Sequence, residues 1–250
     1  MRQIFAVYKR EIGLYFRSPV AYAIAFALLL FFGLLFSNSI STGNGQAPAD
    51  SVNFVPNLLT FLLFLVGPLL TMRLLAEETR EGTLEVLMTL PMRESQFIIG
   101  KFLAVWTYYT VVLLLTVIYH IILTSIGTPD AGRAFTMYLG AWLYGGAVLA
   151  VTMIWSAVTE DQIVAAFLGA ATVLVLYLAE VAASWFANLP NQSDASGLTN
   201  FVRELGLQAH YEATLLQGII RLEDILYFVF VIIAALFITT RIVEVRRWRS

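Results

Sequence analysis

The chain has 250 residues, of which 59% are hydrophobic and 13% are charged, with a net charge of −2 and no cysteine. Soluble domains carry about 25% charged residues, so the composition excludes an ordinary soluble domain, and the lack of cysteine excludes disulfides and thiolate metal sites. Several apolar runs are about 20 residues long, the length of a helix that crosses a hydrocarbon core of about 30 Å. The sequence therefore predicts an all-α membrane protein with six transmembrane helices in a single transmembrane domain, 1–250.

Residues 1–18 show the pattern of a helix that lies at a membrane surface. Apolar residues fall on one side of this helix and four cations on another. A cleaved secretory signal is the alternative for a basic start, but the segment before the apolar run is long and contains Glu11. We therefore expect an uncleaved interfacial (elbow) helix, with Phe5, Tyr8, Lys9, Arg10, Ile12 and Arg17 as its interfacial residues.

Two transmembrane helices are expected over residues 19–76. The first, about 20–40, opens at Pro19, because the first helical turn tolerates proline. The loop 41–54 is rich in Gly, Pro, Ser and Asn and holds no Lys or Arg. The second span is expected at about 55–76, with a kink at Pro68.

The charged segment 77–101 separates two long apolar runs. At about 100° per residue, a helix here gathers acidic residues on one side and apolar residues on another. A surface helix at about 78–90 is suited to receive a push from a soluble partner, and a solvated connector is the alternative. We expect Gly82 and Pro91 to interrupt it. The acidic side consists of Glu78, Glu81 and Glu85, and the apolar side consists of Leu84, Leu87 and Met88.

Three further spans are expected over residues 102–187. They lie at about 102–126, 134–158 and 162–187. The middle span contains two small-xxx-small pairs, a spacing at which helix backbones can approach closely in lipid. These pairs are formed by Ala141, Gly145, Gly146 and Ala150.

Residues 188–224 are polar and then amphipathic, so we expect a re-entrant or extramembrane segment between spans five and six. Span six is expected at about 225–240 and is followed by a basic tail, so that 225–250 forms the last part of the domain. Six spans place both termini on one side. The N-terminal helix, the 73–101 region and the tail hold 12 Lys or Arg, against 3 in the loops of the other side. The positive-inside rule therefore predicts that both termini and segment 77–101 are cytoplasmic.

The chain lacks the phosphate-binding loop of ATPases, the H-E-x-x-H motif of metalloproteases and the G-x-S-x-G motif of serine hydrolases. A phosphate-binding loop needs a glycine upstream of its Gly-Lys pair, but Gly100-Lys101 lacks that glycine and is followed by Phe102. A metalloprotease needs neighbouring histidines, but His120 and His210 are 90 residues apart. We therefore expect a non-catalytic chain with no cofactor or metal of its own.

An ion-coupled secondary transporter is the alternative function. Such a protein needs ionisable groups at mid-membrane, because a buried charge is costly and is kept for a task. His120 and Glu180 are the candidates, although each could instead pair with a neighbouring helix or reach the interface. No inverted repeat is visible in the sequence.

Three stretches resemble one family, the ABC-2 type permeases, which are the membrane subunits of ABC exporters. The stretch 77–85 (EETREGTLE), with Thr89-Leu90-Pro91 and Gly100-Lys101, resembles their signature between spans two and three. Tyr8-Lys9-Arg10-Glu11 with Ser18-Pro19 resembles their N-terminal surface helix. Residues 210–224 resemble the segment before span six, nearest to the gliding-motility-associated subgroup, although Tyr211 stands where that subgroup usually has phenylalanine.

The resemblance implies a permease subunit of an ATP-driven ABC transporter, either an exporter or a force-transmitting complex, in the bacterial cytoplasmic membrane. Its partners would be cytoplasmic ABC ATPase subunits that hold ATP and Mg, a second permease (a homodimer or a sister subunit), membrane lipids and an extracytoplasmic accessory protein, but no nucleic acid. Spans one, two and five would line the dimer interface and the substrate route. The apolar spans favour a lipid-linked, amphiphilic or apolar cargo.

The resemblance also assigns the ATPase contact to the segment between spans two and three and to the N-terminal helix. We expect the acidic side of the surface helix to meet basic residues of the ATPase or of the N-terminal helix, where Lys9 and Arg10 are candidates. The expected coupling residues are Glu77, Glu78, Arg80, Glu81, Gly82, Thr83, Leu84, Glu85, Leu87 and Pro91.

Overall fold

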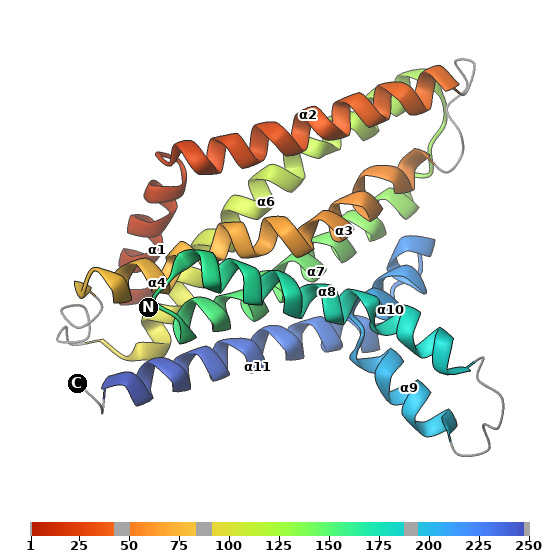
Figure 1. The fold of residues 1–250 in the computed structure, drawn as a ribbon. Coiled ribbons are helices and arrows are strands. Elements are labelled where there is room, and N and C mark those ends of the chain that lie inside the picture. Colours follow the sequence, from red (N-terminus) through yellow and green to blue (C-terminus); the bar gives the residue numbers. More distant parts are fainter. Residues whose placement is uncertain (1, 43–50, 84–91, 188–194, 248–250) are drawn as a thin grey trace.

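The computed structural model describes residues 2–42, 51–83, 92–187 and 195–247, which form a bundle of helices without strands (Figure 1). In this part of the chain, six helices are long and apolar enough to cross a membrane. The prediction of an all-α membrane protein with six spans is therefore confirmed. The elements are α1 (Arg2–Tyr15), α2 (Pro19–Thr42), α3 (Ser51–Thr71), α4 (Arg73–Arg80), α6 (Glu94–Ile126), α7 (Ala131–Val158), α8 (Gln162–Ala187), α9 (Ala195–Leu205), α10 (Leu207–Glu212), the short 3-10 helix η1 (Leu215–Gln217) and α11 (Leu222–Arg247).

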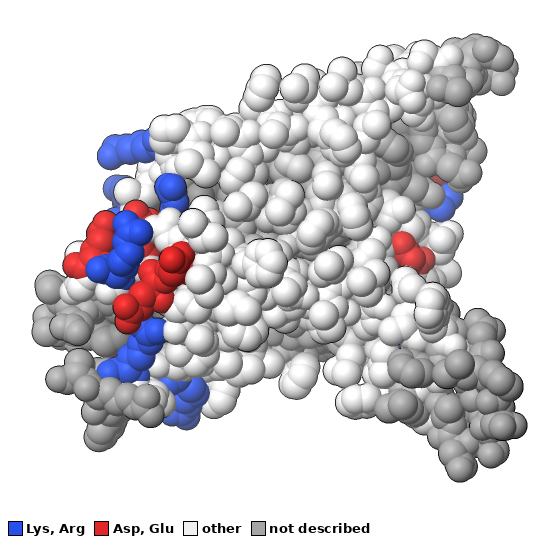
Figure 2. Space-filling view, viewed as in Figure 1, with Lys and Arg blue, Asp and Glu red and all other residues white. Residues whose placement is uncertain are grey.

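Both chain termini lie at the same end of the bundle as α4, and α9 and α10 lie at the opposite end (Figure 1). We call these the α4 end and the α9 end. Figure 2 shows charged side chains gathered at the α4 end, whereas the visible surface between the two ends is almost free of charge. This distribution suits a bundle whose middle lies in hydrocarbon, because charges are costly there.

Three of the spans are clearly longer than predicted. The sixth, expected at about 225–240, is α11, Leu222–Arg247. The second, expected at 55–76, begins at Val55 as predicted and continues through α4 to Arg80. The third, expected from 102, begins at Glu94, so the last part of segment 77–101 is continuous with the spanning helix α6. Hydropathy marks where hydrocarbon begins, whereas the helical hydrogen bonds continue beyond that point until a cap residue ends them.

Helix α7 is the centre of the bundle and packs against α3, α6, α8 and α11. Its glycines make room for aromatic rings of α6, a use of small residues that the small-xxx-small pattern did not predict. A Cβ atom at Gly145 would lie 2.2 Å from Cε1 of Tyr109, and one at Gly146 would lie 2.9 Å from Cε2 of Trp106. These two contacts fix α6 against the centre of the fold.

Helix α2 lies beside α6 at the edge of the bundle (Figure 1). Two tyrosines of α6 hold it. The Tyr108 hydroxyl donates a hydrogen bond to the backbone oxygen of Ala21 (2.6 Å), and the Tyr119 hydroxyl donates to that of Leu29 (2.7 Å). The outward side of α2 is apolar and exposed.

The segment between the fifth and sixth spans folds back onto α7. Tyr211 of α10 and Leu215 of η1 are fully buried. A Cβ atom at Gly140 of α7 would lie 2.8 Å from Cε2 of Tyr211 and 2.9 Å from Cβ of Leu215. The segment is therefore an integral part of the α9 end.

Candidate functional site

Helix α1 packs against the first turns of α6, which brings the N-terminal helix next to the segment predicted to couple. Gly100 of α6 faces the buried Val7 of α1. A Cβ atom at Gly100 would lie 2.9 Å from Cβ of Val7 and 3.1 Å from the backbone oxygen of Ile4. Glycine at this position thus permits the close approach of the two helices. On the other side of α1, Phe5 is 64% exposed, so an apolar side chain remains available to a membrane surface.

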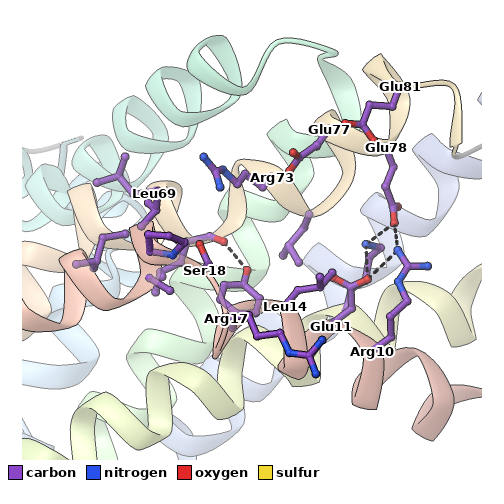
Figure 3. Close-up of a pocket in the computed structure, with 18 of the residues that line it drawn as sticks. Arg10, Glu11, Leu14, Arg17, Ser18, Leu69, Arg73, Glu77, Glu78 and Glu81 are labelled. Atoms are coloured by element: carbon purple, nitrogen blue, oxygen red, sulfur yellow. Dashed lines mark hydrogen bonds and ion pairs between the residues drawn. The ribbon is translucent and has the colours of Figure 1, made fainter.

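Beside Gly100, four charged side chains form a closed set of ion pairs, which we call the ion ring: Arg10, Glu11, Glu78 and Lys101 (Figure 3). Nζ of Lys101 lies 3.1 Å from Oε1 of Glu11 and 2.9 Å from Oε1 of Glu78. Nη2 of Arg10 lies 3.2 Å and 2.6 Å from the same two oxygen atoms. The ring therefore joins α1, α4 and α6.

The ion ring is electrically neutral and mostly buried. The side chains of Lys101 and Glu11 are 2% and 5% exposed, and that of Arg10 is 47% exposed. An unpaired charge at this depth costs several kcal/mol, so each member of the ring depends on the others. Nζ of Lys101 also lies 5.0 Å from the ring centroid of Phe97, which adds a cation–π contact. The ion ring is therefore a rigid connection between α1, α4 and α6. Glu78 is too deeply buried in it to offer its carboxylate to a soluble partner.

Tyr15 makes a second connection between α1 and the spanning helices. Its hydroxyl donates to the backbone oxygen of Leu70 in α3 (2.5 Å), and its ring stacks on Tyr108 of α6 with 5.3 Å between the centroids. Burial raises the pKa of Tyr15 well above its ordinary value, and the neighbouring Glu11 carboxylate raises this pKa further. The hydroxyl therefore stays protonated and remains a donor across the physiological pH range.

The second span is interrupted at Met72, close to the predicted kink at Pro68, and one hydroxyl of α7 connects the two parts. Oγ of Ser156 accepts hydrogen bonds from the backbone N–H groups of Leu75 (3.0 Å) and Ala76 (3.1 Å). The same hydroxyl donates to the backbone oxygen of Met72 (3.0 Å). Ser156 therefore supplies the hydrogen bonds that a kinked helix would otherwise lack.

The predicted surface helix at 78–90 begins inside α4, which includes residues 78–80 and ends at Arg80. The backbone then turns at Glu81 and Gly82. Gly82 has a φ of 68°, in the left-handed region that glycine tolerates best, so it does interrupt the helix as predicted. The hydroxyl of Thr83 donates to the backbone oxygen of Glu78 (3.3 Å). The other predicted residues of this helix lie outside the described part of the chain: Leu84, Glu85, Leu87, Met88 and Pro91.

A cavity of about 730 Å³ opens next to the ion ring, between the α1–α2 corner and the α3–α4 helices (Figure 3). Leu14, Leu69 and neighbouring apolar side chains line one part of it. Arg17, Arg73 and Glu77 line another. The α4 end therefore carries both a rigid charged joint and a hollow of mixed polarity.

The structure brings together some of the predicted site residues. Arg10 meets Glu78, which is one of the two partners that the sequence left open for that acid. Lys9 is exposed and, within the described ranges, forms no ion pair. Glu77, Arg80 and Glu81 lie at or near the surface of the α4 end. Contact of any of these residues with an ATPase stays a prediction.

Sequence reasoning missed Glu11 and Lys101 as site residues. Each gave a signal that could have been used. Glu11 is the one acid in the N-terminal helix, and Lys101 is followed by a long apolar run without charge. Each would be costly to bury alone, and the pairing of the two removes that cost.

The residues proposed for ion coupling are not brought together by the described structure. His120 of α6 is partly buried, and its Nδ1 has no hydrogen-bond partner among the described residues. Glu180 lies in α8, and its side chain lies outside the description. Helix α7 packs against both α6 and α8.

The fold and the site define a multi-pass membrane protein whose charged end is tied to its spanning helices. In sequence, residues 37–205 match the family described as ABC-2 family transporter protein, and this match covers more than half of the chain. The chain therefore belongs to the ABC-2 family of transporter membrane proteins. Members are non-catalytic permeases that work with a cytoplasmic ABC ATPase. No curated protein matches the chain in sequence.

Proposed function

We propose that this permease converts ATP-driven movement of a separate cytoplasmic ABC ATPase into movement of its membrane helices, as part of an exporter or a force-transmitting complex. The observation that carries the proposal is the ion ring, because it joins α1 and α4 to the spanning helix α6 through buried charges. A push on the α4 end is then passed on by the joint and is not absorbed by a loose surface helix.

Two routes lead from α4 into the membrane. The first runs through Glu78 and Lys101 into α6. The second runs through the interruption at Met72 and through Ser156 into the central helix α7. Packed protein interiors are stiff. A displacement of α4 that is passed on to α6 and α7 therefore moves each of these helices as a whole.

The surface that we propose for the ATPase contact lies beyond the ion ring. Glu77 and Glu81 are only partly buried or exposed, and neither forms an ion pair within the described part of the structure. They are therefore available to basic residues of a partner, and we propose that Leu84, Glu85 and Leu87 extend this surface. Exposed ion pairs contribute about 0–1 kcal/mol each, so the contact must also depend on shape.

We propose that the α4 end faces the cytoplasm of a bacterial cell, with the chain in the cytoplasmic membrane. The excess of Lys and Arg in the segments at this end supports that orientation. ATP and Mg would be held by the ATPase subunit. The α9 end, with its folded-back segment, would then face outward and could contact an extracytoplasmic accessory protein.

We further propose that the permease pairs with a second permease, either another copy or a sister subunit. The outward faces of α2 and α8 support this, since they carry large exposed apolar residues such as Phe26 (67%) and Phe167 (77%). The gliding-motility-associated subgroup remains part of the proposal and depends on the likeness of residues 210–224 alone.

The decisive experiment is purification of the tagged permease from native membranes, followed by identification of the co-purified proteins. We expect an ABC ATPase to co-purify with the wild type, and we expect charge reversal by Glu81→Arg to reduce its yield at least about tenfold, since like charges then face each other. Glu223→Arg is the matched control, because Glu223 is an exposed acid at the α9 end. Equal ATPase recovery with Glu81→Arg and Glu223→Arg contradicts the proposed contact.

The same purified sample distinguishes the proposed permease from the alternative, an ion-coupled secondary transporter. An ion-coupled transporter would purify without an ATPase and would respond to an ion gradient. Substitution of His120 or Glu180 would abolish that response.

A further inference from the structure

We propose that the cavity at the α4 end binds the headgroup of a phospholipid that carries both a phosphate and a primary amine, such as phosphatidylethanolamine. The site would hold one lipid of the leaflet on the α4 side of the membrane. The inference does not depend on the ATPase contact and needs only the membrane placement of the chain.

The cavity has the volume and the polarity gradient that such a ligand requires. Its volume is about 730 Å³. Apolar residues line it from two walls, Leu14, Val20 and Ile24 on one and Leu69 on the other. At its charged side lie arginines and glutamates. A soluble phosphate or amine would leave the apolar walls in water, whereas a lipid covers them with its acyl chains.

Two arginines supply the phosphate-binding part. Arg17, in the turn between α1 and α2, and Arg73, from the start of α4, both line the cavity, and their side chains lie apart from each other (Figure 3). Neither side chain has a hydrogen bond or an ion pair within the part of the chain that the structure describes. Arginine binds phosphate oxygens through two parallel N–H bonds, so either side chain can bind a lipid phosphate at its own part of the cavity.

Carboxylates supply the amine-binding part. Glu77 and Glu81 line the same cavity and form no ion pair with any described residue. A primary ammonium has three N–H donors and can satisfy these oxygens, whereas a quaternary ammonium has none. A headgroup without an amine would bring no cation to these carboxylates.

The lipid preference follows from these contacts. Phosphatidylethanolamine offers a phosphate to the arginines and N–H donors to the glutamates. Phosphatidylglycerol offers the phosphate and hydroxyl donors but no cation, and phosphatidylcholine offers the phosphate and a quaternary ammonium that cannot donate. We therefore expect retention in the order phosphatidylethanolamine, phosphatidylcholine, phosphatidylglycerol, with about a tenfold difference between first and last.

The test is native mass spectrometry of the full-length permease, purified in detergent without an ATPase and titrated with each of the three lipids. We expect Arg17→Gln with Arg73→Gln to reduce retention of phosphatidylethanolamine about tenfold, since two charge-assisted contacts are lost. The matched control is Arg80→Gln with Arg221→Gln, which removes the same charge from two exposed arginines that do not line the cavity. Equal retention by the two double variants overturns the site.

Two further arms test the chemistry. Glu77→Gln with Glu81→Gln should abolish the preference for phosphatidylethanolamine over phosphatidylglycerol, whereas Glu160→Gln with Glu223→Gln should keep it. A preference for phosphatidylethanolamine that survives Glu77→Gln with Glu81→Gln overturns the role of the amine.

Soluble glycerophosphoethanolamine should compete at least about a hundredfold more weakly than the lipid, because it lacks the acyl chains. Equal competition overturns the assignment to a lipid and indicates a small soluble ligand. Because no ATPase is present, failure here leaves the proposed transport function untouched.

Discussion

Lys101 and Glu11, 90 residues apart in the chain, form an ion pair of 3.1 Å in which both side chains are almost completely buried. The pair connects the N-terminal helix to a helix that crosses the membrane. Its burial makes it sensitive to the loss of either charge, because the remaining charge is then left without a partner.

The first prediction concerns this pair. We expect Lys101→Met to lower the free energy of unfolding by about 3–5 kcal/mol, because Glu11 and Glu78 lose their shared buried partner. Equilibrium unfolding in mixed micelles measures this change. Lys9→Met removes an exposed lysine of the same end and should change stability by less than about 0.5 kcal/mol. Adding Glu11→Gln to Lys101→Met should recover part of the loss, since Arg10 and Glu78 can still pair. A Lys101→Met variant as stable as Lys9→Met contradicts the prediction.

The second prediction concerns the contact between α1 and α6. Gly100→Ala places a Cβ atom 2.9 Å from Cβ of Val7, so we expect a loss of about 1–3 kcal/mol from overpacking. Gly13→Ala is the control, since nothing lies within 4 Å of the added atom on α1. Proteolysis of the N-terminal helix should become faster only with Gly100→Ala. If both variants resist proteolysis like the wild type, the close approach is not needed to hold α1.

The third prediction concerns the interruption in the second span. Ser156→Ala removes the acceptor of two backbone N–H groups, and each unsatisfied buried donor costs about 1–3 kcal/mol. We expect faster hydrogen exchange at the amides of Leu75 and Ala76. Ser125→Ala should leave exchange at these amides unchanged, because the Ser125 hydroxyl is exposed and bonds only within its own helix turn. Unaltered exchange in Ser156→Ala would show that the helix closes its own hydrogen bonds.

The fourth prediction concerns the α9 end. Nδ1 of His210 lies 2.9 Å from Oδ1 of Asp224, which is 5% exposed, and the His210 ring stacks on Tyr227. His210→Phe keeps the stacking but leaves Asp224 unpaired, so we expect a loss of about 1–3 kcal/mol and faster hydrogen exchange over residues 207–217.

Glu223→Gln, next to Asp224 in sequence but exposed, is the control for this end. Combining His210→Phe with Asp224→Leu should restore protection, because neither polar group then remains. Equal exchange in His210→Phe and Glu223→Gln would mean that the folded-back segment is held by Tyr211 and Leu215 alone.

Much of the fold could be predicted from the sequence because membranes impose simple rules. A run of about 20 apolar residues must satisfy its backbone within itself, so helices were the expected element. The termination at Gly82 followed from the conformational freedom of glycine. The ends of α4 and α6 could not be predicted in this way, because Glu77 and Glu94 are polar yet continue helices that begin or end beyond hydrocarbon.

The site was harder to predict because it depends on contacts between distant segments. A helical projection places Glu78 and Glu81 on one side, but only Glu78 is buried, because Lys101 and Arg10 happen to meet it there. A helical projection describes one helix in isolation, whereas the ion ring is formed by residues of three different helices. The pairing of Glu11 with Lys101 would require knowledge of how α1 crosses α6, and that crossing depends on the space left by Gly100.

The attachment of α2 leaves a particular freedom to evolution. Both tyrosine hydroxyls that hold this helix bind main-chain oxygens, those of Ala21 and Leu29, and so they do not read the identity of its side chains. Substitutions along the outward face of α2 can therefore accumulate without detaching the helix. The outward face of α2 can vary in this way while the same anchorage to α6 is kept.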